Sequence, residues 1–313
     1  MLLARRATSC SSCVRRRHAG GKRIIQLIRE VLIGMPTIAV TGANGYIGRH
    51  VVKELCDAGA TVIAIDAYGE QCDDRASLVA ADILDGDFSV EERLGCIPDV
   101  CLHLAWRDGF NHNAPSHMED FSGHYKFLMH MVDAGVSRIA VMGSMHEVGY
   151  WEGAIDEDTP CRPQSLYGVA KDALRRALTL ELGRRGVDLQ WLRGFYIYGD
   201  DELSQSIFGK LLRAAKAGEK TFPFTMGKNL YDFTPVDQLA RMIAATVLQD
   251  EVLGVINCCS GKPVSLADQI ESFIRDNELN IELQYGVFPD RPYDSPGVWG
   301  DATKINQIMI QLS

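Results

Sequence analysis

The sequence predicts an α/β fold, in which a doubly wound parallel sheet is accompanied by a smaller C-terminal subdomain. From Met35 onward, short apolar runs alternate with amphipathic stretches such as 121–132 and 172–182. This alternation is typical of a parallel sheet with helices on both faces. After Gly199 the alternation loosens, and Pro and Gly become frequent. The predicted strands are 37–40, 61–65, 100–104, 138–142 and 189–192.

The chain of 313 residues is long enough for one large or two small domains. We expect residues 1–34 to form a basic tail outside the fold and residues 35–199 to form the sheet domain. We expect residues 200–313 to form mainly the smaller subdomain, which would cover a substrate, with some return to the sheet.

The tail differs from the body in charge. Residues 1–34 hold eight Lys or Arg and one acid, a balance of +7, whereas the remainder carries 24 basic and 40 acidic residues, a balance of -16. A segment rich in Arg and Ser with almost no acid resembles an organelle transit peptide. An upstream extension, with Met35 as the working start, is the alternative. We favour this alternative because the folded pattern begins directly after Met35.

Composition excludes several classes of protein. No stretch approaches the roughly 20 apolar residues of a membrane span, and the acidic body argues against a nucleic-acid partner. The nine Cys are scattered, several inside apolar runs, which favours buried free thiols in a reducing compartment and hence a cytoplasmic location. An organelle remains the alternative if the tail is a transit peptide. The eight His do not form an H-E-x-x-H pattern, and we predict no metal.

A glycine-rich loop connects the first predicted strand to a predicted helix. Residues 41–48 read T-G-A-N-G-Y-I-G, and this context is typical of a nucleotide-phosphate site. Gly42 allows a tight turn, Gly45 lets a pyrophosphate approach the backbone, and Gly48 lets the helix pack closely on the strand. The helix N-terminus offers free N–H groups to phosphates. Asn44, Tyr46 and Ile47 complete the predicted cofactor loop, which makes 35–199 a dinucleotide-binding domain.

Acidic residues follow the next two apolar runs. Asp66 ends the second strand, 18 residues past Gly48, where an acid accepts hydrogen bonds from the adenosine ribose and repels a 2′-phosphate. We therefore expect NAD(H), although Arg75 keeps NADP(H) possible. Asp82, followed by Ile83, could bind the adenine amino group.

The residues that suit proton transfer stand near other predicted strand ends. Leu104 and Ala105 close a buried strand at the sheet edge where ligands bind. Ser144 ends the next strand, and Tyr167 and Lys171, four residues apart, share one face of a helix. An ammonium there lowers the pKa of the phenol. A serine hydroxyl and a phenol can move a proton while a nicotinamide moves a hydride.

Residues 36–305 resemble the extended short-chain dehydrogenase/reductases, a group of NAD-dependent nucleotide-sugar epimerases, dehydratases and reductases with a Rossmann-type fold. The resemblance rests on the glycine loop, on the motifs named above, and on Arg193, Tyr198-Gly199, 231–233 and 300–304. It implies that Ser144, Tyr167 and Lys171 are the catalytic triad, with Tyr167 and Lys171 also contacting the cofactor. It implies that Arg291 binds the diphosphate of a nucleotide sugar, and that the protein is a homodimer.

This chain differs from the pattern of the group at positions that are expected to face the substrate. Dehydratases carry Asp-Glu directly after the catalytic hydroxyl residue, where this chain has Met145 and His146. Methionine cannot exchange a proton, so dehydration is disfavoured. Tyr196 replaces the usual Asn, and Tyr231 stands where Arg is frequent. We expect Ser144, Met145, His146, Tyr196 and Arg291 to face the substrate.

Two enzyme classes and one binding class fit these residues. The favoured class is an NAD(H)-dependent reductase of a nucleotide-linked 4-keto-6-deoxyhexose, acting reversibly, as the resemblance to deoxysugar reductases implies. The alternative is a C4 epimerase of the UDP-glucose 4-epimerase type, which uses the same triad without net cofactor consumption. A catalytically inactive NAD sensor is disfavoured because Ser144, Tyr167 and Lys171 are all present.

Overall fold

The structure is a computed structural model that describes residues 34–68, 72–199, 205–289 and 294–311. The chain divides into two compact units, 1–36 and 37–313, and the second contains every helix and strand described below. Apart from Gly34, the predicted tail lies outside the described residues. None of the described helices is long and apolar enough to cross a membrane.

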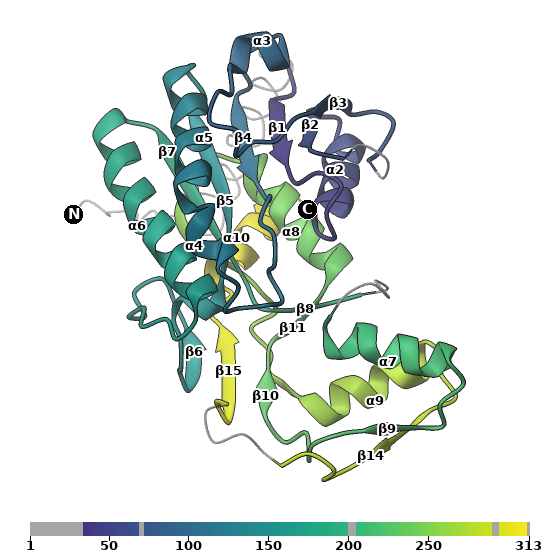
Figure 1. The fold of residues 1–313 in the computed structure, drawn as a ribbon. Helices are drawn as coiled ribbons and strands as arrows, with labels where there is room; N and C mark the ends of the chain where they lie inside the picture. The colour runs from purple at the N-terminus through teal and green to yellow at the C-terminus, as the bar shows by residue number, and fades with distance from the viewer. Residues whose placement is uncertain (1–33, 69–71, 200–204, 290–293, 312–313) are drawn as a thin grey trace, which may run out of the picture. The chain divides into compact units, whose positions relative to one another are not determined.

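Seven parallel strands form the central sheet (Figure 1). The spatial order is β12 (Gly254–Cys258), β7 (Asp188–Gly194), β5 (Arg138–Ser144), β4 (Val100–His103), β1 (Thr37–Thr41), β2 (Thr61–Asp66) and β3 (Ser77–Ala80). The five predicted strands are present, and the predicted α/β class is confirmed. The strand order changes direction between β1 and β4, so a crevice opens there at the carboxyl ends of the strands, where such sheets bind ligands.

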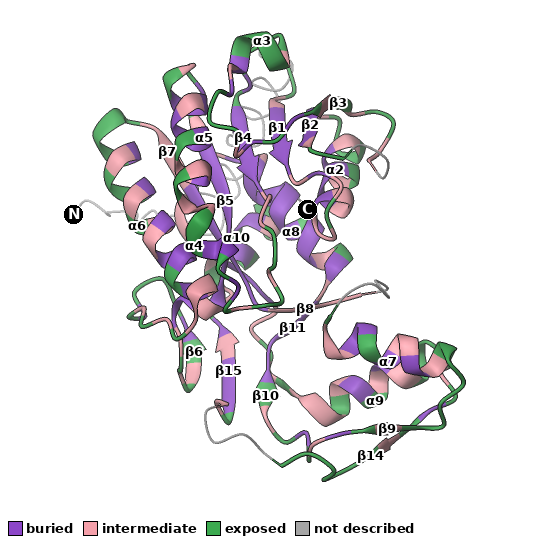
Figure 2. Cartoon of the chain, viewed as in Figure 1, coloured by how far each residue is buried: buried purple, intermediate pink, exposed green. Residues whose placement is uncertain are grey.

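Helices cover both faces of the sheet, as the alternating sequence pattern predicts. On one face, α2 (Gly48–Asp57), α8 (Val236–Val247) and α10 (Thr303–Gln311) bury apolar side chains in one core cluster. On the other, α3 (Val90–Leu94), α5 (Phe121–Asp133) and α6 (Leu166–Arg185) contribute to a second. Figure 2 shows the central strands β1, β4 and β5 almost entirely buried between these layers, whereas the edge strand β3 is largely exposed. The sheet is thus a rigid platform for residues at its carboxyl edge.

Helix α6 begins and ends at residues suited to those positions. The hydroxyl of Ser165 accepts a hydrogen bond from the N–H of Gly168 and caps the first turn. Gly186 ends the helix in the left-handed conformation that favours glycine. These caps fix the phase of the helix, and with it the direction of Tyr167 and Lys171 in the first two turns.

A third core cluster lies below the carboxyl edge of the sheet and contains Phe208, Phe224 and Phe273. Its helices are α7 (Ile207–Lys216) and α9 (Leu266–Asp276). Its strands form the pairs β8 (Tyr196–Tyr198) with β11 (Phe233–Pro235) and β9 (Thr221–Pro223) with β14 (Glu282–Gln284), and a small sheet of β13 (Val264–Ser265), β10 (Leu230–Tyr231), β15 (Gly297–Gly300) and β6 (Gly153–Ile155). Two further short helices are α4 (Ser116–Glu119) and η1 (Met145–Glu147). The predicted domain boundaries stay predictions.

Candidate active site

A cleft of about 1270 Å³ lies at the carboxyl edge of the sheet. Its walls include the glycine loop, the ends of β2, β4 and β5, the start of α6, and residues of β8, β9 and α7. Pockets for single drug-sized ligands are typically about 300–1000 Å³. The cleft is therefore large enough for a dinucleotide together with a second ligand.

The glycine loop has the close approaches that explain two of its glycines. Gly42 has a φ of 67°, and a Cβ there would lie 2.7 Å from the Ala105 backbone. A Cβ on Gly48 would lie 2.0 Å from the carbonyl oxygen of Gly42. Helix α2 therefore starts against the loop, as predicted, and no side chain caps its N-terminus. A helix N-terminus at the wall of the cleft is a typical binding site for a dinucleotide pyrophosphate.

Asp66, the last residue of β2, is hydrogen-bonded to the glycine loop. Its carboxylate accepts hydrogen bonds from the N–H of Asn44 at 3.0 Å and of Tyr68 at 3.2 Å. Arg75 is bound instead by Asp57 and Asp73, each at 2.7 Å. The guanidinium considered for a 2′-phosphate is thus engaged by two other carboxylates, which favours the predicted NAD(H).

The remaining predicted cofactor residues also lie on the cleft. Asp82 accepts a hydrogen bond from the N–H of Leu84 at 2.9 Å, and Ile83 is buried beside it. The cleft lining includes every predicted cofactor residue except Asn44, whose backbone N–H is hydrogen-bonded to Asp66. The lining members are Gly42, Gly45, Tyr46, Ile47, Gly48, Asp66, Asp82, Ile83, Leu104, Ala105, Tyr167 and Lys171. The glycine cradle and the acid at the end of β2 fit a nicotinamide dinucleotide.

Ser144 is fixed by a buried carboxylate that sequence reasoning missed. Glu147 is fully buried, accepts a hydrogen bond from the N–H of Ser144 at 2.6 Å, and is bonded to the indole N–H of Trp191 at 3.0 Å. A Cβ on Gly143 would lie 2.1 Å from that indole nitrogen. Glycine before Ser144 is therefore required by the space that Trp191 and Glu147 occupy.

Two arginines compensate the buried charge of Glu147. Arg193 and Arg175 lie 3.6 and 3.8 Å from one of its oxygens. Burial raises the pKa of Glu147, whereas these two cations favour the carboxylate. The motif Gly-Ser-x-x-Glu carried the signal for this residue, because in a capping box the acidic partner follows the cap residue by three positions. The structure shows such a box at η1.

Tyr167 and Lys171 point into the cleft beside Ser144. The Tyr167 side chain is hydrogen-bonded to that of Ser144, and Lys171 Nζ donates to the carbonyl of Met142 at 2.7 Å. Lys171 Nζ lies 5.9 Å from the phenol ring centroid. The structure thus brings together the three residues predicted to be the triad.

The pKa of Tyr167 differs in direction from the sequence-based expectation. Burial raises the pKa of the phenol to about 12, with Ser144 acting in the opposite direction. Burial also lowers the pKa of Lys171 to about 7. Both shifts have the same cause, because a site that excludes water disfavours the charged form of either group.

Aromatic residues missed by sequence reasoning surround Tyr167. The ring of His112 stacks on Tyr167 at 5.3 Å, and His117 lies at the same centroid distance. Trp106 is stacked on His124 at 4.3 Å. The position of Trp106, directly after the strand end that closes with His103, Leu104 and Ala105, was the available signal.

Only some of the predicted substrate residues line the cleft. His146 lines the cleft, 4.2 Å from the ring of His112, and Tyr196 lines it while stacked on Tyr231 at 4.2 Å. Met145 is 6% exposed and belongs to the third core cluster, not to the cleft lining. Arg291 lies outside the described residues. Substrate contact by these residues stays a prediction.

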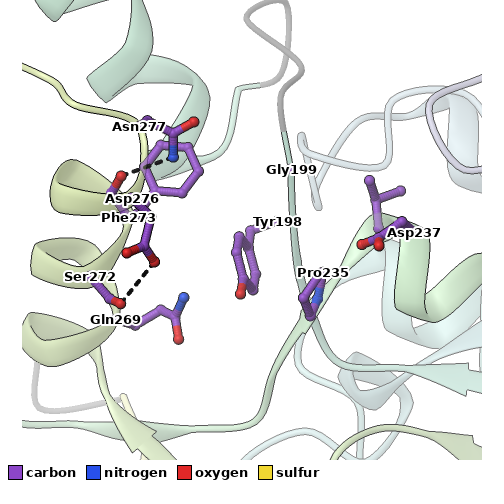
Figure 3. A pocket seen from close by; sticks show the side chains of 10 residues that line it. Tyr198, Gly199, Pro235, Asp237, Gln269, Ser272, Phe273, Asp276 and Asn277 are labelled. Carbon is purple, nitrogen blue, oxygen red and sulfur yellow. Dashed lines mark hydrogen bonds between the residues drawn. The ribbon is translucent and has the colours of Figure 1, made fainter.

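A smaller hollow of about 290 Å³ lies between the strands β8 and β11 and helix α9. Figure 3 shows Tyr198 and Pro235 on one side and Ser272 and Phe273 on the other. None of the predicted catalytic or cofactor residues lines it. The reacting groups are therefore in the larger cleft. Within the described residues no group of His, Cys, Asp or Glu could hold a metal ion.

The sheet order, the glycine cradle and the Ser-Tyr-Lys constellation define a Rossmann-type dinucleotide-dependent oxidoreductase. A model of the NAD dependent epimerase/dehydratase family matches residues 38–259. The chain therefore belongs to that family, and the predicted enzyme class and NAD cofactor are confirmed.

Individual relatives agree with this assignment. The dTDP-6-deoxy-L-talose 4-dehydrogenase (NAD(+)) of Aggregatibacter actinomycetemcomitans is 45% identical over 274 residues, which cover 84% of this chain and 98% of that protein. A UDP-glucose 4-epimerase of Lactobacillus helveticus is 23% identical over 301 residues, 87% of this chain and 90% of that protein.

Solved structures share the fold. UDP-glucuronic acid 4-epimerase from Bacillus cereus, in complex with UDP-glucuronic acid and NAD, has a TM-score of 0.74 at 21% identity and covers 88% of this chain and 93% of its own. MoeE5 in complex with UDP-glucuronic acid and NAD has a TM-score of 0.72 at 27% identity. The match covers 87% of this chain and 92% of the MoeE5 chain.

Proposed function

We propose that this protein catalyses the reversible NAD(H)-dependent reduction of the 4-keto group of a nucleotide-linked 4-keto-6-deoxyhexose, with dTDP-6-deoxy-L-talose as the first candidate product. The observation that carries the proposal is 45% identity to a dTDP-6-deoxy-L-talose 4-dehydrogenase across 98% of that protein. The cleft supports it, because Ser144, Tyr167 and Lys171 lie together beside a dinucleotide cradle.

Each group of the triad has one task in this reaction. The nicotinamide, when bound, supplies or accepts the hydride. Ser144 holds the C4 oxygen of the sugar, and its position is fixed through its backbone N–H by Glu147. Tyr167, bonded to Ser144, gives its proton to that oxygen during reduction and removes it during oxidation. Lys171 provides positive charge beside the phenol and orients the nicotinamide ribose.

The residue that follows Ser144 argues against dehydration as the reaction. A dehydratase needs groups that take a proton from one carbon and give one to a leaving hydroxyl. Met145 has no ionisable group and is buried away from the cleft lining. Reduction or oxidation at C4 needs only one proton-exchanging side chain, Tyr167, in addition to the hydride of the nicotinamide.

The proposed substrate is a diphosphate-linked sugar. Members of the family with this fold have been solved with UDP-sugars and NAD, and the cleft extends from the glycine loop to α7 and β9. Such a length accommodates a nucleoside diphosphate as well as the cofactor. We place Arg291 at the diphosphate, and His146 and Tyr196 at the sugar.

We also propose a homodimer. Three exposed apolar side chains lie on the neighbouring helices α4 and α6: Met118 is 45% exposed, Val169 39% and Leu180 72%. Apolar groups on one surface are stabilised when a partner covers them. The cytoplasm is the proposed location, because Cys101, Cys258 and Cys259 are buried as free thiols.

The decisive experiment measures cofactor stoichiometry. The protein is mixed with NADH and a dTDP-4-keto-6-deoxyhexose, and absorbance of the reduced cofactor is followed. One NADH should disappear per sugar reduced, and dTDP-6-deoxy-L-talose with NAD⁺ should form NADH. If the keto sugar leaves NADH unchanged while UDP-glucose and UDP-galactose interconvert, the protein is a C4 epimerase instead.

A further inference from the structure

Trp106 contacts the ammonium group of Lys171. Nζ lies over the indole, 3.7 Å from the ring centroid, well within the distance of a cation–π interaction. The lysine side chain is 2% exposed, and its hydrogen-bond partner is the neutral carbonyl of Met142. Among the described carboxylates none forms an ion pair with Lys171. The indole face and the Met142 carbonyl are thus the described groups that contact and stabilise the positive charge.

The indole is held in place through its N–H and its ring. Its N–H donates to Nδ1 of His117 at 3.1 Å. His117 Nδ1 is therefore the acceptor, so Nε2 carries the proton and donates to the carbonyl of Asn111 at 2.9 Å. The indole plane is stacked on His124, with an interplanar angle of 9°. Both contacts restrict rotation of the ring.

A chain of hydrogen bonds connects this stack to the strand that precedes the cofactor loop. His124 Nδ1 lies 3.0 Å from His103 Nε2, and His103 Nδ1 lies 2.9 Å from the Thr41 hydroxyl. Burial lowers the pKa of both histidines, to about 3 for His124. Both rings are neutral, so each of these bonds needs only one proton and neither ring repels Lys171.

We propose that Trp106 is a positioning residue for Lys171: its aromatic face keeps the buried ammonium charged and directed toward the nicotinamide side of the cleft. This inference rests on the proposed role of Lys171 in the reduction. It assigns a function to a residue outside the Ser-Tyr-Lys triad. Trp106 acts through the lysine and exchanges no proton itself.

The other charged and titratable groups that face Lys171 determine in which direction its pKa should change when Trp106 is replaced. Glu147 on η1 favours the ammonium, burial disfavours it, and Tyr167, His103 and His124 are neutral. Removing the aromatic face removes a favourable interaction with the charged form, so the pKa of Lys171 must fall. A cation–π interaction of ~0.5–2 kcal/mol corresponds to a fall of about 0.4–1.5 in pKa.

The test measures that pKa directly and without substrate. The protein is labelled with ¹³Cε-lysine, its NMR signals are followed against pH, and Lys171→Met assigns the signal. Trp106→Leu should lower the pKa of Lys171 by the amount above. Trp106→Phe, which keeps an aromatic face but loses the N–H, should lower it less. Trp151→Leu removes an indole that lies outside the cleft and should leave the pKa unchanged.

The same variants are then assayed for reduction. Reduction needs Tyr167 protonated and Lys171 charged, so kcat/KM should be constant below the pKa of Lys171 and fall above it. In Trp106→Leu this fall should begin at a lower pH. An unchanged lysine pKa in Trp106→Leu, or equal effects of Leu and Phe, would overturn the inference. Failure of the reduction assay with the predicted NMR shift would instead count against the proposed function alone.

Discussion

At the scale of the residue, Tyr167 is the side chain that we propose to exchange the proton in the cleft. Its hydroxyl is bonded to Ser144, and burial keeps the pKa of the phenol at about 12. At neutral pH the group is therefore protonated and ready to donate during reduction.

Replacing Tyr167 by Phe removes this proton donor and leaves the ring in place. General acid–base groups typically contribute about 10²–10⁴-fold to the rate, so kcat for reduction should fall by that order. Binding of NADH, measured by fluorescence titration, should change little. A variant that retains near-normal turnover would refute the role proposed for Tyr167.

A second residue-scale prediction concerns Asp66, which we expect to set the preference for NADH over NADPH. Asp66→Asn retains an acceptor for the N–H of Asn44 but removes the charge that repels a 2′-phosphate. The preference for NADH over NADPH in kcat/KM should narrow by about tenfold, equivalent to ~1.4 kcal/mol. Asp73→Asn, which leaves Asp66 intact and frees Arg75 from one partner, is the comparison. A wild-type enzyme that already prefers NADPH would contradict this interpretation.

At the scale of the element, the start of α2 depends on the absence of a side chain at Gly48. A Cβ there would meet the Gly42 carbonyl at 2.0 Å and Ala43 at 2.9 Å, both backbone atoms. The helix would have to move away from the glycine loop, which is the predicted site of the pyrophosphate.

Gly48→Ala should therefore weaken NADH binding and lower stability, since overpacking typically costs about 1–3 kcal/mol. Gly183 in α6 is the matched control, because a Cβ there meets no atom within 4 Å. Gly183→Ala should raise stability by up to ~1 kcal/mol through helix propensity. Thermal melting and NADH titration measure both effects. Normal cofactor affinity in Gly48→Ala would show that the close approach is not required.

At the scale of the whole molecule, residues 37–313 form one compact unit with its own sheet and core. Removing residues 1–34 should therefore leave folding and activity intact. Soluble yield, melting temperature and NADH consumption of the protein starting at Met35 check this expectation. Loss of soluble protein on truncation would assign the basic segment a part in the fold.

The proposed dimer is a second property of the whole molecule. Leu180→Glu places a charge on the exposed apolar face of α6 and should convert the dimer to a monomer, because an unpaired buried charge is unfavourable. Ile310, 75% exposed on α10, is the control position. Light scattering coupled to size-exclusion chromatography gives the mass. A wild-type monomer, or a dimer unaffected by Leu180→Glu, would disprove this interface.

The sequence by itself determined the fold class and the glycine loop, and it predicted Ser144, Tyr167 and Lys171, which the structure brings together. Hydrophobic runs report burial, and the spacing of Tyr167 and Lys171 places both on one face of a helix, so these features are local. Strand β3 was anticipated only as the short apolar run before Asp82 and not among the predicted strands of the sheet, because it is short and its residues are largely exposed. Strand β12 was missed because it lies where the alternating pattern has loosened.

Only the tertiary structure decided which distant residues share a site. Glu147 meets Trp191 and Arg193 from β7 behind Ser144, and Trp106 meets Lys171 from a different strand and helix. The tertiary structure also decided the pKa of Tyr167, which burial raises although the sequence predicted that Lys171 would lower it. Desolvation depends on how many atoms the fold places around the phenol. Sequence spacing reports neighbours along one element, whereas contacts across elements and the exclusion of water arise only when the sheet and its helices have packed.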